Sequence, residues 1–156
     1  MAPAARILDA GCGTGRVGAE LYRRGHRVVG VDVDPELVAA AAGDHPGPTW
    51  LQADLATLDL AALGLTEPFD AAVIAGNVMP YLAPGTEADV LSRVAAAVRP
   101  DGVIVVGFGL GRGYPLAAFD ADIASAGLRL EHRFATWDLR PWTPSANFAV
   151  SVLRRP

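Results

Sequence analysis

Three aspartates and a group of glycines in this sequence have the types and spacing of a nucleotide-binding site. Asp9 and Asp32 each end a short apolar run, and Asp54 follows a third one. Glycines between positions 11 and 15 let the backbone turn tightly and approach a ligand at the start of the next helix. A carboxylate at the tip of the neighbouring strand can accept hydrogen bonds from both hydroxyls of a ribose. These features predict a site for a cofactor that contains adenosine.

Two classes of cofactor fit the glycines taken alone. Residues 13–18 match G-x-G-x-x-G, and Asp32 follows at the spacing typical of nicotinamide-dependent enzymes. However, Asp9 stands where a dinucleotide-binding strand normally has an apolar residue, and an acid there suits a ligand that presents an amine. Asp54 is placed to receive an adenine amino group, and 156 residues leave no room for a separate substrate domain. An NAD(P)-dependent oxidoreductase is therefore the weaker alternative.

Short apolar runs alternate with helical patterns along the chain, which is typical of a parallel sheet wrapped by helices. The last two runs have no room for a helix between them, so we expect an antiparallel pair. Asp34 and a capping box at residues 86–89 are predicted to begin helices. The predicted strands are 6–10, 27–32, 49–53, 69–75, 103–108, 128–138 and 146–153. The predicted helices follow residue 15, residue 34, residue 86 and residue 115, and residues 55–63 are predicted to form a short helix or turn.

Composition limits the function classes that remain. The 156 residues suffice for one α/β domain spanning 1–156, and a net charge of −4 argues against a nucleic-acid partner. No apolar run reaches the roughly 18 residues needed to span a bilayer. Residues 1–6 show no signal-peptide core, and Cys12 is the only cysteine, so we expect a cytoplasmic protein. One cysteine and scattered histidines form no metal-binding spacing, and we expect no metal.

The full set of motifs resembles the class I S-adenosylmethionine-dependent methyltransferases, and in particular small bacterial members of unassigned substrate. The resemblance covers almost the whole chain, with five motifs in the family's order. They are Ile7-Leu-Asp-Ala-Gly-Cys-Gly-Thr-Gly15, Val29-Gly-Val-Asp32, Ala53-Asp54-Leu55, Phe69-Asp-Ala-Ala-Val-Ile-Ala75 and Val98-Arg-Pro-Asp-Gly102.

The resemblance implies a fold and a set of cofactor residues. The fold is a doubly wound, Rossmann-like sheet of seven strands in the order 3-2-1-4-5-7-6, with strand 7 antiparallel and helices on both faces. The methionine amine and carboxylate of S-adenosylmethionine would be held by Asp9 and by the backbone of residues 11–15, which include Gly11, Cys12, Gly13 and Gly15. The ribose and adenine would contact Asp32, Val33, Asp54 and Leu55, and the sulfonium would be bordered by Gly76 and Asn77.

The resemblance also implies transfer of the sulfonium methyl group to an oxygen or nitrogen of a small-molecule acceptor, with S-adenosylhomocysteine as product. The substrate side would lie beyond the carboxyl ends of the strands and be built from residues 77–81, 108–114 and 137–142. Its polar candidates are Asn77, Tyr81, Arg112, Asp138 and Arg140, none of which is assigned as a base. Trp137 and Trp142 either stack on a planar substrate or cap the hairpin.

The front of the chain differs from the family pattern. Family members usually carry helices before the first strand that cover the cofactor, whereas only five residues precede Arg6. We therefore expect either a truncated chain or a cofactor site that is more open than usual. This feature also supports an alternative function, a non-catalytic S-adenosylmethionine-binding module or subunit.

Overall fold

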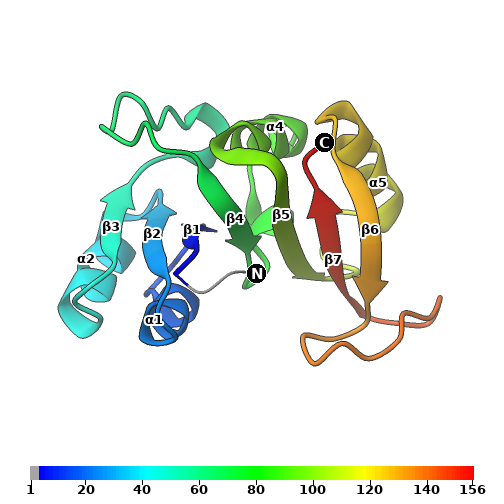
Figure 1. Cartoon of the computed structure of the whole chain (residues 1–156). Coiled ribbons are helices and arrows are strands. Elements are labelled where there is room, and N and C mark those ends of the chain that lie inside the picture. Colours follow the sequence, from blue (N-terminus) through cyan, green and yellow to red (C-terminus); the bar gives the residue numbers. More distant parts are fainter. Residues whose placement is uncertain (1–3) are drawn as a thin grey trace.

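The central feature of the computed structural model, which describes residues 4–156, is a seven-stranded mixed sheet with helices around it (Figure 1). The strand order is β3-β2-β1-β4-β5-β7-β6, and β7 is antiparallel to both of its neighbours. The predicted order and the antiparallel last pair are confirmed. The strands are β1 (Arg6–Ala10), β2 (Arg27–Asp32), β3 (Thr49–Gln52), β4 (Phe69–Ile74), β5 (Val98–Gly109), β6 (Arg129–Phe134) and β7 (Phe148–Arg154).

The helices lie between these strands at the predicted places, with one addition. The short helix or turn predicted after residue 54 is a 3-10 turn, and the sequence did not predict α3. None of the helices within residues 4–156 is long and apolar enough to cross a membrane. The helices are α1 (Arg16–Arg23), α2 (Pro35–Asp44), η1 (Leu55–Thr57), α3 (Val78–Tyr81), α4 (Glu87–Ala97) and α5 (Leu116–Ser125).

The two predicted helix caps have different outcomes. Asp34 caps α2 as predicted, since its Oδ1 accepts a hydrogen bond from the Glu36 N–H at 2.8 Å and Pro35 occupies the first helical position. The capping box at Thr86 is wrong. Its hydroxyl donates instead to the Ala83 carbonyl oxygen at 2.6 Å, because the tight turn before α4 offers that acceptor first.

The core lies where β4 and β5 cross the centre of the sheet. Both strands read as apolar runs without alternation, as expected for parallel strands covered on both faces. Phe69, Ile74, Ile104 and Val106 are completely buried there. This rigid centre fixes the carboxyl ends of β1, β2 and β4, where the predicted site residues lie.

Trp50 on β3 explains three of the glycines near the first two strands. A Cβ atom on Gly15 would lie 2.8 Å from the Trp50 indole and one on Gly18 would lie 2.9 Å from it, while one on Gly30 would overlap the ring. The indole N–H donates to the His45 carbonyl oxygen at 2.9 Å, which fixes the ring in this position. These glycines therefore serve packing between helix, strand and indole.

We predict that Gly30→Ala destabilises the protein, because its methyl group would overlap Trp50 inside a packed layer. Overpacking of this kind costs about 1–3 kcal/mol in the free energy of unfolding. Urea denaturation followed by tryptophan fluorescence measures the change. Gly43→Ala in α2 is the matched control, since its added Cβ meets nothing within 4 Å and alanine favours the helix. Equal stability of the two variants would contradict this role for Trp50.

Candidate functional site

Two cavities adjoin at the carboxyl ends of β1, β2 and β4. The larger has a volume of about 360 Å³ and the smaller about 200 Å³, and both are lined by Gly11, Gly13 and Gly76. Together they fall in the size range of small-molecule sites, about 300–1,000 Å³. The larger is mostly apolar and the smaller mostly polar. Such a pair suits a ligand with one apolar, ring-bearing part and one charged part.

Asp9 supplies a buried carboxylate to the smaller cavity. It is the second-to-last residue of β1 and is only 2% exposed. Its Oδ2 accepts a hydrogen bond from the Gly18 N–H of α1 at 2.9 Å. Burial raises the pKa of this carboxyl to about 6; the Gly18 N–H opposes the rise and the nearby Asp32 adds to it. A cationic ligand group in the cavity would stabilise the charged form.

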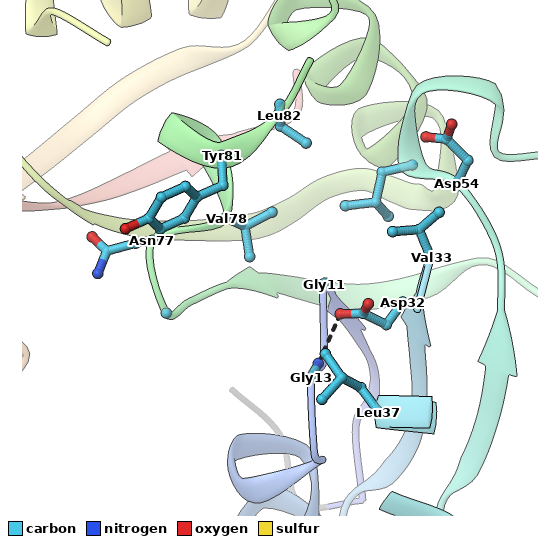
Figure 2. Close-up of a pocket in the computed structure, with 12 residues that line it drawn as sticks. Gly11, Gly13, Asp32, Val33, Leu37, Asp54, Asn77, Val78, Tyr81 and Leu82 are labelled. Atoms are coloured by element: carbon cyan, nitrogen blue, oxygen red, sulfur yellow. Dashed lines mark hydrogen bonds between the residues drawn. The ribbon is translucent and has the colours of Figure 1, made fainter. Parts of the chain in front are cut away.

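Asp32 lies at the edge of the larger cavity and joins the start of α2 to residues 11–15, the turn between β1 and α1, here called the glycine turn. Its Oδ2 accepts from the Gly13 N–H at 2.9 Å, drawn as a dashed line in Figure 2, and its Oδ1 accepts from the Asp34 N–H at 3.0 Å. A carboxylate has about four lone-pair sites. Asp32 therefore holds the turn and can still accept two further hydrogen bonds from a ligand.

Val33 and Asp54 form one end of the larger cavity (Figure 2), which Leu55 also lines. Asp54 is exposed and begins η1, with its Oδ1 accepting from the Ala56 N–H at 2.9 Å. Val33 is exposed as well, although it is a large apolar side chain. An exposed valine beside an exposed carboxylate can pack on an apolar ring and accept from its polar edge.

Asn77 connects the ends of β4 and β5 at the opposite end of the larger cavity. Its backbone is left-handed, with a φ of 60°, and its Oδ1 accepts from the Gly109 N–H at 2.6 Å. The short helix α3 follows directly and places Val78 against the glycine turn, where a Cβ on Gly11 would lie 2.6 Å from the Val78 side chain. Asn77 therefore positions the wall that carries Val78, Tyr81 and Leu82 (Figure 2).

The glycine turn leaves space that a cofactor can fill. Gly13 and Gly76 have positive φ angles, and a Cβ on either would meet nothing within 4 Å because each faces the cavities that it lines. Beside them, the Asp9 carboxylate has the chemistry to receive an ammonium group. These residues fit the polar tail of S-adenosylmethionine.

Ten of the predicted cofactor residues line one or both cavities. Asp9 and Cys12 line the smaller, and Gly11, Gly13 and Gly76 are shared. Gly15 lines neither, because it lies against Trp50. Burial raises the pKa of the Cys12 thiol to about 12, so the thiol stays protonated at neutral pH. The larger cavity is also lined by Asp32, Val33, Asp54, Leu55 and Asn77.

The remaining substrate-side candidates divide into two groups. Tyr81 lines the larger cavity and accepts a hydrogen bond at its hydroxyl from Arg112 Nη1 at 3.0 Å. Asp138 and Arg140 form an ion pair with each other at 3.4 Å in the loop between β6 and β7 and line neither cavity. The Trp137 indole lies over Gly107 of β5, and that of Trp142 lies 6.0 Å from the Arg133 guanidinium. Both indoles therefore have partners within the C-terminal part of the sheet.

Sequence reasoning missed several lining residues. Val78 and Leu82 have helical spacing, which could have identified one face of a short helix after β4. Arg16 could have been found because it directly follows the glycine turn. Across residues 4–156 no group of histidine, cysteine, aspartate and glutamate side chains is arranged to hold a metal ion. The lining residues outside the predicted site are Leu37 and Leu82 in the larger cavity and Arg16, Val17 and Ala75 in the smaller, whereas Thr14 and Val78 fall within the predicted ranges 11–15 and 77–81.

Comparison with known proteins relates this geometry to one family. Residues 7–102 match the model of a methyltransferase domain. The chain is 38% identical to a TehB-like S-adenosylmethionine-dependent methyltransferase from Corynebacterium glutamicum. The two structures superpose with a TM-score of 0.94 over 100% of this chain and 83% of that one.

Curated relatives match over shorter stretches. Magnesium-protoporphyrin O-methyltransferase of Rhodobacter capsulatus is 38% identical over 79 residues, which is 51% of this chain and 35% of that protein. Trans-aconitate 2-methyltransferase of Azoarcus sp. is 36% identical over 105 residues, 66% of this chain and 38% of that protein. The chain therefore spans little more than a third of the length of these curated relatives.

Proposed function

This chain belongs to the class I S-adenosylmethionine-dependent methyltransferase family, and we propose that it binds S-adenosylmethionine across the two cavities and methylates an oxygen or nitrogen of a small-molecule acceptor. The observation that carries the proposal is that two carboxylates, Asp9 and Asp32, line the two adjoining cavities. One is a buried carboxylate in a polar cavity, and the other borders an apolar cavity with free acceptor capacity. A ligand with an ammonium group and a ribose matches both.

Each cavity would hold one half of the cofactor. Asp9 would pair with the methionine ammonium group, and the backbone between Gly11 and Gly13 would approach its carboxylate. Asp32 would accept hydrogen bonds from the ribose hydroxyls. Its hydrogen bond from the Gly13 N–H holds the carboxylate beside the glycine turn for this role. Val33 would pack on the adenine, and Asp54 with the Leu55 amide would bind its polar edge.

Methyl transfer requires mainly that the protein places the methyl donor and the acceptor correctly. When bound, the cofactor supplies a methyl group already activated by a sulfonium. The chain's part is to orient donor and acceptor in line and to exclude water, which accounts for most of the effect expected in such transfers. Gly76 and Asn77, where the two cavities meet the wall of α3, would border the reacting centre. A general base is needed only for an acceptor that arrives protonated.

A thermal-shift series tests the proposal. S-adenosylmethionine and S-adenosylhomocysteine at about 100 times their Kd should each add roughly 2.7 kcal/mol to the free energy of unfolding, which raises the Tm by several degrees. NADH at the same molar concentration should leave the Tm unchanged. A shift with NADH alone would contradict the proposal and favour a nicotinamide-dependent enzyme. Binding without S-adenosylhomocysteine formation on a panel of metabolite acceptors would instead indicate a non-catalytic module.

A further inference from the structure

Most arginines of this acidic chain have a carboxylate partner, and one that has none within residues 4–156, Arg112, lies beside the larger cavity. Nine of the 13 arginines lie within 4.0 Å of a carboxylate oxygen in the described chain. Arg93 and Arg155 donate instead to backbone carbonyl oxygens of residues outside both cavities. The other two, Arg16 and Arg112, lie at the carboxyl edge of the sheet, with Arg16 in the smaller cavity and Arg112 beside Tyr81.

The contacts of Arg112 place its guanidinium beside two residues that line the larger cavity, Tyr81 and Asn77. Its Nη1 donates to the Tyr81 hydroxyl at 3.0 Å. Its Nε lies 2.7 Å from the point that a Cβ of Gly109 would occupy, and the Asn77 Oδ1 lies 3.3 Å from the same point. The guanidinium is therefore close to Asn77. In Figure 2, Asn77 lies at the end of the cavity away from Asp32 and Asp54.

Most hydrogen-bond donors of Arg112 and Tyr81 have no partner within the described chain. A guanidinium carries five N–H donors in a planar fork that matches a carboxylate, and one of them is given to Tyr81. Because the Tyr81 oxygen accepts that bond, its own O–H proton remains free to donate elsewhere. Tyr81 is 72% exposed and lines the cavity, and Arg112 is exposed as well. A ligand at the Tyr81 hydroxyl is therefore also close to the guanidinium that is bonded to it. All of the free groups are donors, and the matching ligand group is an oxyanion.

We propose that Arg112 and Tyr81 bind the carboxylate of a small organic acid, and that this carboxylate is the methyl acceptor. The inference rests on the function proposed above and names its substrate class. One carboxylate oxygen would be held by the Arg112 and Tyr81 donors while the other attacks the methyl carbon. A C–O bond forms, the C–S bond breaks, and its electron pair stays on sulfur. The products are a methyl ester and S-adenosylhomocysteine, and no proton is released.

A carboxylate acceptor also agrees with where the candidate general bases of the described chain lie. A carboxylic acid with a pKa near 4 is already ionised at neutral pH, whereas an alcohol needs a base in the transition state. His26 and His45 precede strands, at the opposite edge of the sheet, and His132 is stacked beside Phe134 on β6. Asp138 holds Arg140 and Thr136 in the β6–β7 loop. The polar groups at the Tyr81 end of the cavity are thus suited to an acceptor that needs no deprotonation.

Binding to the protein saturated with S-adenosylhomocysteine tests the inference without requiring turnover. The probes are benzoate, phenylacetate and trans-aconitate, each compared with its neutral amide by ligand-observed NMR titration. We expect at least one carboxylate to bind tenfold or more tightly than its amide. Arg112→Gln should remove that preference and Tyr81→Phe should weaken it, while the exposed control Arg129→Gln on β6 should retain it. Equal binding of acids and amides, or an unchanged preference in Arg112→Gln, would overturn the inference.

The product distinguishes failure of this inference from failure of the proposed function. Transfer of labelled methyl from S-adenosylmethionine to the bound acid should give an ester that releases labelled methanol in mild base. A base-stable product, or methylation of benzylamine or benzyl alcohol but of none of the acids, would refute the carboxylate acceptor and leave the methyltransferase function intact. Failure to bind either sulfur compound would refute the function itself, and the inference with it.

Discussion

Asp9→Asn is expected to weaken cofactor binding while stabilising the cofactor-free protein at neutral pH. The asparagine oxygen can keep the hydrogen bond from the Gly18 N–H, but the amide carries no charge to pair with the methionine ammonium group. Loss of a charge-assisted hydrogen bond costs about 1.5–3 kcal/mol, which is roughly a 10–150-fold increase in Kd. Isothermal titration with S-adenosylmethionine at pH 7.5 measures this loss.

The gain in stability follows from the raised pKa of Asp9. Its pKa is about 6 in the folded protein, against 3.8 for the ordinary group. Between these values the folded state binds more protons than the unfolded chain, so the free energy of unfolding of the native sequence falls as the pH rises from about 4 to 6. Above pH 6 the ionised, buried carboxylate costs about 1–3 kcal/mol. Asparagine avoids this cost, and below pH 4 the two proteins should have equal stability.

Urea denaturation of both proteins at several pH values between 4 and 8 tests whether the stability advantage of Asp9→Asn grows as the pH rises. The difference between them isolates Asp9, because the other titrating groups are common to both. Gly43→Ala, at an exposed position near the end of α2, is the control, because it changes no ionisable group and should show a difference that does not vary with pH. A constant difference for Asp9→Asn would contradict the raised pKa. Cofactor affinity of the native protein should change in the opposite sense and rise with pH through about 6, since the ammonium group pairs with the ionised form.

Asp32→Ala is expected to raise the Kd for S-adenosylhomocysteine by about 5–150-fold, corresponding to roughly 1–3 kcal/mol. Two contributions add. The ribose hydroxyls lose their acceptor, and the Gly13 and Asp34 N–H groups lose the carboxylate that joins the glycine turn to α2. Isothermal titration measures the total.

A double-mutant cycle separates the two contributions. The 2′,3′-dideoxy analogue of S-adenosylhomocysteine lacks both hydroxyls, so Asp32→Ala should affect its binding only through the loosened turn. A large coupling between the substitution and the hydroxyls supports direct binding of the ribose. Equal losses for the two ligands would show that Asp32 acts only by holding the backbone, and an unchanged Kd would exclude both roles.

Much of the fold and part of the site followed from local patterns. The apolar runs without alternation placed β4 and β5, and the Asp34-Pro35 pair placed the start of α2. The position of each aspartate at the end of a strand put Asp9, Asp32 and Asp54 at one edge of the sheet, because parallel strands end on the same side. These features depend on residues close together in the chain, which is why the sequence contained them.

The sequence alone determined the family, the order of the strands and the carboxylates that border the two cavities. The tertiary structure decided which glycines face a cavity and which accommodate Trp50, since a glycine pattern is the same in both cases. It also decided that α3 folds against Gly11 and that Arg112 reaches Tyr81, 31 positions away in the chain. Contacts of that kind arise because packing of the sheet brings the ends of β4 and β5 together, and no local pattern encodes which side chains then meet.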